Sequence, residues 1–236
     1  MKQVAILGLS YFGSAVLDEL LDMDVDILII DKDREVLDRY RDTVSAAIGM
    51  DVINQEALEK TLPKHIDAVV IDMGKNIEAS ILAASYCNKL GVGTIIAKAE
   101  TDAHGEILEL VGATKVVFPN REAAKRIVPQ IVSSLVLNYL PVGGNLVIAE
   151  VEIPEFFIGK TVLELDLRKK YGLNLISVRS VDTEYRLFMP DYRFQEKDIA
   201  LVSGTETDVD RFAGRLEKEQ SSKGFINSIK ELFNKK

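Results

Sequence analysis

A glycine-containing turn near the start of the chain has the residue types needed to bind a phosphate. An apolar run at residues 4–7 leads directly into Gly8-Leu9-Ser10-Tyr11-Phe12-Gly13, and a helical pattern follows. In the pattern G-x-G-x-x-G, the first glycine permits the tight turn and the third lets the helix pack closely on the sheet. The N–H groups at the helix start can then bind a pyrophosphate. Ser10 replaces the second glycine, so the turn predicts nucleotide binding with one departure.

An acidic residue follows the second predicted strand, which covers residues 25–30. Asp31 follows Gly13 at about the 20-residue spacing of dinucleotide-binding units. A carboxylate there accepts hydrogen bonds from ribose hydroxyls and repels a 2′-phosphate, so it favours an adenosine with free hydroxyls. The alternative is a glycine turn needed only for packing, with Asp31 as a helix cap. Strand, turn, helix, strand and acid in this order favour the nucleotide site.

The composition is that of an acidic chain with enough apolar residues for a sizeable core. Of 236 residues, 47% are hydrophobic, and 29 basic against 37 acidic residues give a net charge of −8. This length predicts two domains, and the absence of a basic block argues against a nucleic-acid partner. The single cysteine, Cys87, cannot form an internal disulfide and is expected to be buried. A reducing cytoplasm suits it, and the chain starts with a strand and not a signal-peptide pattern.

Strand and helix patterns alternate along the first 120 residues. Strands are expected at residues 3–8, 25–31, 44–48, 66–73, 93–98 and 115–118. Alternation of this kind predicts an α/β fold with a doubly wound parallel sheet, covered by helices on both faces. Ligands of such sheets bind at the carboxyl ends of the strands, where Gly8 and Asp31 lie.

Residues 127–149 carry no charged side chain, which raises the question of a membrane span. Two prolines, two glycines and several polar side chains interrupt the segment, so a span is not expected. We predict instead a buried helix followed by a turn and a strand. The helix would pack on a domain or on a second subunit.

The second half of the chain predicts a small α+β domain. Strands are expected at residues 146–153, 174–179, 186–189 and 199–203, and helices at 162–171 and 208–219. We divide the chain into a nucleotide-binding domain with a crossover helix (1–134), a hinge (135–144), the α+β domain (145–219) and an amphipathic tail (220–236). Exposed strand edges of the small domain predict cover by a partner subunit. The apolar stripe of the tail would pack on its own domain, a partner or a membrane surface.

Five stretches in both halves resemble one family. They are residues 8–13, 66–80, 97–99, 107–113 and 165–172. Over about residues 1–215 the chain is similar to the TrkA/KtrA regulators of bacterial potassium uptake. The resemblance implies a Rossmann-like RCK-N (KTN) domain that binds NAD(H), ATP or ADP, followed by an RCK-C (TrkA-C) domain. It also implies homodimers in an octameric ring beneath a membrane potassium-translocating subunit, which the ring gates by nucleotide exchange without catalysing a reaction.

The resemblance further implies which residues hold the nucleotide. They are Gly8, Ser10, Tyr11, Phe12 and Gly13 at the phosphates, Asp31 and Lys32 at the ribose, Asp51 and Val52 at the adenine, and Gly74, Asn76 and Lys98 across the cleft.

Besides Ser10, two positions depart from the family pattern. Tyr11 replaces an arginine that reaches a distal phosphate, and Asn120 replaces an acid that can hold a divalent ion. Tyrosine cannot neutralise a γ-phosphate, and an amide is a poor ligand for a hard cation. Arg121 could restore a positive charge or be a solvated residue of the helix start. We therefore expect ADP, AMP or NAD(H) in preference to magnesium-bound ATP, and no metal ligands.

Some Gram-positive relatives bind cyclic di-AMP across the RCK-C dimer interface. The comparable positions here are Arg168, Asn174, Leu175, Ile176 and Pro190. They would supply an arginine for phosphate, an amide for a purine edge and apolar surface for stacking. The alternative is that they are ordinary strand and core residues of the dimer.

Two other functions remain open. A Rossmann-type NAD-dependent dehydrogenase of the short-chain kind needs a Tyr-x-x-x-Lys pair, which the sequence lacks. His65 and His104 are the only imidazoles, show no matched acid or nucleophile in the sequence, and are expected on the surface. Alternatively, the chain could be an RCK regulator of a different cation transporter.

Overall fold

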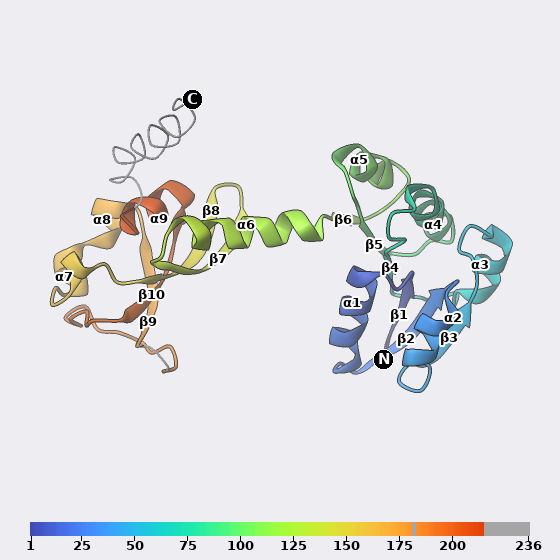
Figure 1. Ribbon diagram of the computed structural model, residues 1–236, viewed down its shortest axis with the longest axis horizontal. Coiled ribbons are helices and arrows are strands. Elements are labelled where there is room, and N and C mark those ends of the chain that lie inside the picture. The colour runs from blue at the N-terminus through green and yellow to red at the C-terminus, as the bar shows by residue number, and fades with distance from the viewer. Residues whose placement is uncertain (181–182, 215–236) are drawn as a thin grey trace, which may run out of the picture. The chain divides into compact units, whose positions relative to one another are not determined.

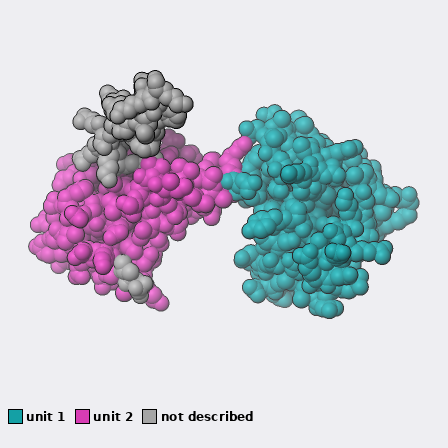
Figure 2. All heavy atoms as spheres, in the orientation of Figure 1, with its two compact units in different colours: residues 1–120 teal, residues 121–236 magenta. Residues whose placement is uncertain are grey.

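The computed structural model describes residues 1–180 and 183–214 (Figure 1). The chain forms two compact units, residues 1–120 and 121–236 (Figure 2). Each unit has its own sheet and its own hydrophobic core. The amphipathic tail expected at residues 220–236 lies outside the described residues.

The first unit contains a six-stranded parallel sheet in the order β3-β2-β1-β4-β5-β6. Its strands are β1 (Lys2–Leu7), β2 (Val25–Asp31), β3 (Ala46–Gly49), β4 (Ala68–Ile71), β5 (Thr94–Lys98) and β6 (Lys115–Val117). Its helices are α1 (Tyr11–Leu21), α2 (Arg34–Tyr40), α3 (Gln55–Thr61), α4 (Ile77–Lys89) and α5 (Asp102–Leu110). The strand order reverses between β1 and β4, where sheets of this type bind ligands. The predicted Rossmann-like fold is confirmed.

The first unit has a core on each face of its sheet, because successive residues of a strand point to opposite sides. Ala5 and Leu7 of β1 face a cluster that includes Cys87 and other side chains of α3, α4 and α5. Ile6 faces the opposite cluster, formed with α1 and α2. Cys87 is fully buried, as predicted, and burial raises the pKa of its thiol to about 12.

The second unit contains a four-stranded antiparallel sheet in the order β7-β8-β10-β9. Its strands are β7 (Val136–Gly143), β8 (Leu146–Glu152), β9 (Asn174–Ser180) and β10 (Asp198–Thr205). Its helices are α6 (Pro119–Val132), which begins in the first unit, η1 (Glu155–Phe157), α7 (Val162–Leu165), α8 (Leu167–Tyr171) and α9 (Glu206–Phe212). In the core, the Phe157 ring stacks on Phe212 at a centroid distance of 5.3 Å. The predicted α+β unit is confirmed.

The uncharged segment at residues 127–149 folds differently from the prediction. Helix α6 ends at Val132, and residues 136–143, expected within a hinge, pair with β8 as strand β7. Strand β7 lies at the edge of the sheet and pairs with β8 along one side, so the segment forms one arm of a β-hairpin. The helix is also not buried in the single chain, because Ile131 is 76% exposed. Among the described helices, none is long and apolar enough to cross a membrane.

Three other elements of the second unit differ from the prediction. The helix at 162–171 divides into α7 and α8 at Asp166, whose φ of 44° lies in the left-handed region and interrupts the helix. Of residues 186–189, Arg186 forms an isolated bridge with Val178, and no strand develops in this described stretch. Helix α9 ends at Phe212, and residues 215–219 lie outside the described part of the chain.

Candidate functional site

A cavity of about 290 Å³ opens in the first unit at the carboxyl ends of its strands. It is lined by Gly8, Leu9, Ser10, Ile30, Asp31, Lys32, Asp33, Val36, Met50, Asp51, Val52, Asp72, Met73, Gly74, Asn76 and Ala79. The apolar members form a surface on which a flat ring can pack, and the glycine turn supplies backbone N–H groups. The four aspartates outnumber the one lysine, so the lining is acidic. Among described residues, no group of three or more His, Cys, Asp or Glu side chains is arranged to hold a metal ion.

The two glycines of the turn are required by close contacts. Gly8 has a φ of 85°, and a Cβ atom there would lie 2.1 Å from the carbonyl oxygen of Asp72. At Gly13 a Cβ atom would lie 2.3 Å from the carbonyl oxygen of Gly8. Both distances are far below van der Waals contact, so any larger residue would displace the turn from β1 or β4.

Asp31 ends β2 with both carboxylate oxygens facing backbone donors. Its Oδ2 accepts a hydrogen bond from Leu9 N at 2.7 Å, and its Oδ1 accepts one from Asp33 N at 2.9 Å. Asp33, and not Asp31, caps α2 by accepting a bond from Glu35 N. A carboxylate has about four lone-pair sites, so Asp31 can bind ribose hydroxyls while it holds the turn.

Asp72 is central to the cavity but was not among the residues predicted from the sequence. The side chain is fully buried after β4. Its Oδ2 accepts hydrogen bonds from Ser10 Oγ and, at 2.8 Å, from Gly13 N, and its Oδ1 accepts one from Gly74 N at 3.2 Å. An internal carboxylate therefore already uses one N–H group at the start of α1, where an anion was expected. An acid directly after an apolar strand at the switch point was the available signal.

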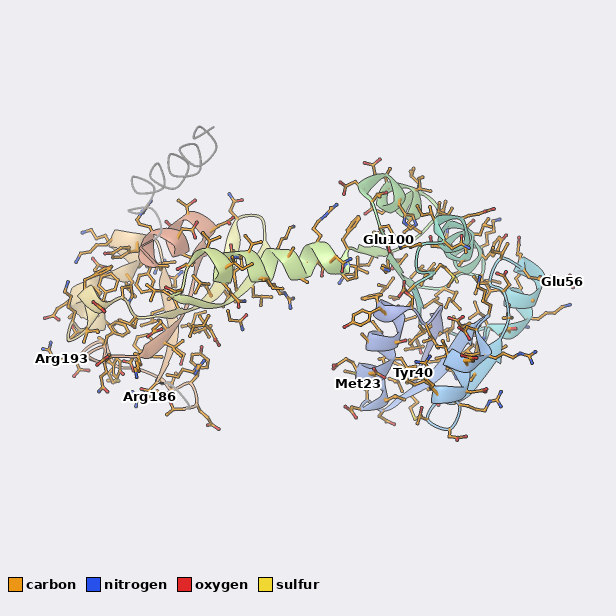
Figure 3. All side chains as sticks on the ribbon, in the orientation of Figure 1. Met23, Tyr40, Glu56, Glu100, Arg186 and Arg193 are labelled. Atoms are coloured by element: carbon orange, nitrogen blue, oxygen red, sulfur yellow. The ribbon has the colours of Figure 1, made fainter. Side chains whose placement is uncertain are left out.

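Lys98 forms ion pairs with two acids. Its Nζ lies 3.3 Å from Asp72 Oδ1 and 2.8 Å from Glu100 Oε1, and Glu100 is labelled in Figure 3. Burial lowers the pKa of Lys98, but the hydrogen bond to Glu100 and the charge of Asp72 outweigh it, so the pKa is raised overall. The lysine is therefore charged at neutral pH and compensates part of the negative charge of Asp72.

The structure brings most of the predicted nucleotide residues together. The cavity is lined, as expected, by Gly8, Ser10, Asp31, Lys32, Asp51, Val52, Gly74 and Asn76. Five other predicted residues, including Arg121, are absent from the lining. Tyr11 is 92% exposed at the start of α1, Phe12 packs against the core on the α1 side, Gly13 is buried, and Lys98 lies beside Asp72. Arg121 is an exposed residue of α6 in the second unit.

His104 was wrongly predicted on the surface. It lies in α5 with 4% exposure. Its ring is hydrogen-bonded to Ser80 on α4 and to Glu100 in the loop before α5. Nδ1 accepts a hydrogen bond from Glu100 N at 3.2 Å, so the neutral ring carries its proton on Nε2 and donates to Ser80 Oγ at 2.7 Å. Burial lowers the pKa of His104, and the charge of Glu100 opposes this in part. His65 is exposed, as predicted.

The second-unit residues expected at a cyclic di-AMP site lie on α8, β9 and the loop before β10. They are Arg168, Asn174, Leu175, Ile176 and Pro190, and all but the half-buried Leu175 are exposed. Pro190 O accepts a hydrogen bond from Leu163 N at 3.0 Å, which places it beside α7. A site across a dimer interface stays a prediction for these residues.

The fold and the cavity define a protein with a Rossmann-like unit followed by a small antiparallel α+β unit. Models of the TrkA-N domain and the TrkA-C domain match residues 4–119 and 146–216, respectively. The chain belongs to the TrkA/Ktr family of potassium uptake proteins. It is 33% identical over 215 residues to Ktr system potassium uptake protein C of Bacillus subtilis, covering 91% of this chain and 97% of that protein. Ktr system potassium uptake protein A of B. subtilis is 25% identical over 211 residues, with 89% and 95% covered.

Solved structures share the fold at low sequence identity. The GsuK channel superposes with a TM-score of 0.62 at 18% identity, covering 88% of this chain and 38% of that chain. A GsuK channel bound to NAD gives a TM-score of 0.60 at 18% identity, covering 90% and 39%. The chain thus spans less than half the length of these channels.

Proposed function

We propose that this chain is a regulatory subunit of a potassium transport system, which senses an adenine nucleotide in the first-unit cavity. The observation that carries the proposal is the cavity itself. The glycine turn, Asp31 and an apolar wall meet at the switch point of the sheet. They do so in a chain that aligns with nearly the whole length of a Ktr potassium uptake protein.

The lining favours a ligand with few phosphate charges. The adenine would pack against Met50 and Val52, Asp31 would accept from the ribose hydroxyls, and the turn at Gly8 would face the phosphates. Each added phosphate brings negative charge close to Asp72. Among the contacts described above, Lys98 is the one cation that offsets the charge of Asp72 at short range. ADP, AMP or NAD(H) therefore fits the lining better than ATP. NAD is also the ligand of the GsuK channel that shares this fold.

The hydrogen bonding of Ser80 and His104 supports sensing without catalysis. Ser80 and His104 form the one serine–histidine pair described above, but the ring nitrogen facing Ser80 Oγ carries a proton and cannot accept one. General-base activation of a serine needs the opposite arrangement.

A second copy of the chain is the proposed cover for the exposed apolar side chains of α6. Ile127, Val128, Ile131 and Val132 are each at least 50% exposed. At ~25 cal/mol per Å², burying several hundred Å² would contribute several kcal/mol to association before its entropic cost. Such dimers would assemble into an octameric ring at the cytoplasmic face of a membrane potassium-translocating subunit. Arg168, Asn174, Leu175, Ile176 and Pro190 would bind cyclic di-AMP across the dimer.

Calorimetric titration of the purified chain with AMP, ADP, ATP, NAD⁺ and NADP⁺ tests the ligand. Asp31→Asn should weaken binding of the preferred nucleotide at least tenfold, about 1.4 kcal/mol, because one ribose acceptor is lost. Asp38→Asn is the matched control, since Asp38 lies on α2 outside the cavity with a 62% exposed side chain. Equal affinity of Asp31→Asn and wild type for every adenine nucleotide would contradict the site.

Potassium dependence of growth tests the transport role. Deletion of the gene in the native cell should impair growth at limiting potassium, and the wild-type gene should restore it. Restoration by Asp38→Asn but not by Asp31→Asn would link the cavity to transport. Normal growth and normal potassium uptake after deletion would contradict the potassium role and would favour regulation of another transporter.

A further inference from the structure

A second hollow, of about 480 Å³, lies wholly within the second unit. It is lined by Phe157, Gly159, Lys160, Glu164, Leu165, Lys170, Tyr171 and Arg193. None of these residues belongs to the first-unit cavity or to the set expected to bind cyclic di-AMP. Its cations come from three segments: Lys160 follows η1, Lys170 lies on α8, and Arg193, labelled in Figure 3, lies in the loop before β10.

The hollow is positive in a chain whose net charge is negative. Three cationic side chains face one carboxylate, Glu164, while the whole chain carries −8. Lys170 Nζ donates to the main-chain oxygen of Glu164 at 3.0 Å, and Lys160 Nζ lies 5.8 Å from the centroid of the Phe157 ring. Neither contact removes a positive charge. Arg193 pairs with Glu164 at the longer distance of 3.7 Å, so the lining keeps a net charge of two positive units.

Two of the cations, Lys170 and Arg193, donate hydrogen bonds to backbone oxygens beside the hollow. Arg193 NH1 donates to Gly159 O at 2.9 Å, and Arg193 forms a β-bridge with Thr161. Glu164 closes the capping box of α7, where its Oε2 accepts a bond from Thr161 N at 2.7 Å. Phe157 and Leu165 are buried beneath these groups. Contacts of this kind reduce the ordering cost that the side chains would incur on binding a ligand.

We propose that this hollow binds a phosphorylated small molecule, with Lys160, Lys170 and Arg193 as ligands of its phosphate. A net charge of two positive units on the lining matches a phosphate dianion. Arginine and lysine are the side chains best suited to its oxygens. The volume exceeds that of a bare ion and lies in the range of small-molecule pockets, and Tyr171 adds an aromatic side chain to the lining. This site is independent of the nucleotide cavity.

Calorimetric titration of the full chain with pyrophosphate at fixed ionic strength tests the proposal. Lys170→Gln and Arg193→Gln should each weaken binding about tenfold, because each removes one charge-assisted contact. Lys169→Gln is the matched control: it removes the same charge from the same helix, but Lys169 does not line the hollow. Glu164→Gln should strengthen binding, since it removes the one negative charge. If the Arg193→Gln variant does not fold, Lys160→Gln replaces it in the test. Lys160 lies outside the helices and strands, so its substitution should disturb the fold less.

Two outcomes would overturn the proposal. Equal weakening by Lys169→Gln and the lining variants would mean general electrostatic attraction. Unchanged binding in every lining variant would place the pyrophosphate elsewhere, for example at the first-unit turn.

Sedimentation with phosphatidylcholine vesicles, with and without phosphatidic acid, distinguishes the phosphate source. Binding to phosphatidic acid that depends on Lys170 and Arg193 would support a lipid headgroup, and pyrophosphate binding without vesicle binding would support a soluble ligand.

Discussion

The carboxylate of Asp72 accepts a hydrogen bond from the backbone N–H of Gly13 at 2.8 Å. In a turn of this kind, that N–H belongs to the group expected to face a phosphate. Ser10, which replaces the second glycine of the pattern, donates to the same carboxylate oxygen. The departure at Ser10 and the acid at Asp72 are therefore one feature: the chain supplies an anion of its own at the start of α1.

Removing the charge of Asp72 should favour ligands with more phosphates. In Asp72→Asn we expect the affinity for ATP relative to AMP to rise about tenfold, roughly 1.4 kcal/mol, because repulsion grows with each phosphate. Calorimetric titration with both nucleotides measures the ratio. Asp51→Asn removes the same charge from another part of the lining and is the control. An equal change in both variants, or none in Asp72→Asn, would show that Asp72 does not determine phosphate preference.

Gly13→Ala should destabilise the first unit. Its Cβ atom would lie 2.3 Å from a backbone oxygen that cannot move without shifting the turn. Overpacking of this kind costs about 1–3 kcal/mol, which exceeds the gain of about 1 kcal/mol from alanine in a helix. Urea unfolding followed by circular dichroism measures the difference. Gly93→Ala is the control, because a Cβ atom there meets nothing within 4 Å, and its stability should stay within about 0.5 kcal/mol of wild type. Similar losses in both variants would argue against the contact.

Stability should fall in mild acid through His104. Burial lowers the pKa of His104 in the folded chain below its ordinary value of 6.5, against the opposing charge of Glu100. As the pH falls, the unfolded chain therefore binds a proton at His104 before the folded chain does. The contribution of the neutral His104 to the free energy of unfolding is complete above about pH 6.5 and is lost as the pH falls through the folded pKa. Urea unfolding of wild type and His104→Gln between pH 7.5 and 5 should show a flatter profile for the variant. His65→Gln, at an exposed position, should keep the wild-type profile.

Ile131→Glu should weaken self-association. The Ile131 side chain is 76% exposed on α6, and burying such a side chain against a second copy contributes about 1.5–3 kcal/mol. A charge at this position should raise the dimer Kd more than tenfold, which light scattering after size-exclusion chromatography can follow across micromolar concentrations. Lys125→Glu, also an exposed position of α6, is the control. A wild-type chain that is monomeric with and without nucleotide would refute the dimer.

The sequence by itself determined the features that depend on local patterns. Strand and helix periodicity gave the order of the first-unit elements, and the spacing of Gly8, Gly13 and Asp31 identified the edge of the sheet where the cavity lies. Cys87 was correctly expected in the core because its neighbours are apolar. These inferences succeed since each rests on residues within one or two elements.

The tertiary structure alone decided which distant side chains meet. Asp72 joins Ser10 across 62 residues and Gly13 across 59, and His104 joins Ser80 across 24. No local periodicity records such pairs, because strand order and helix placement bring them together. The same holds for residues 136–143, whose backbone pairs with β8, and for the cations of the second hollow, which come from three separate segments. The sequence alone does not distinguish a polar side chain on the surface from one in a buried network. Burial is stable only where hydrogen-bond partners offset the loss of hydration, and those partners are brought together by the tertiary structure.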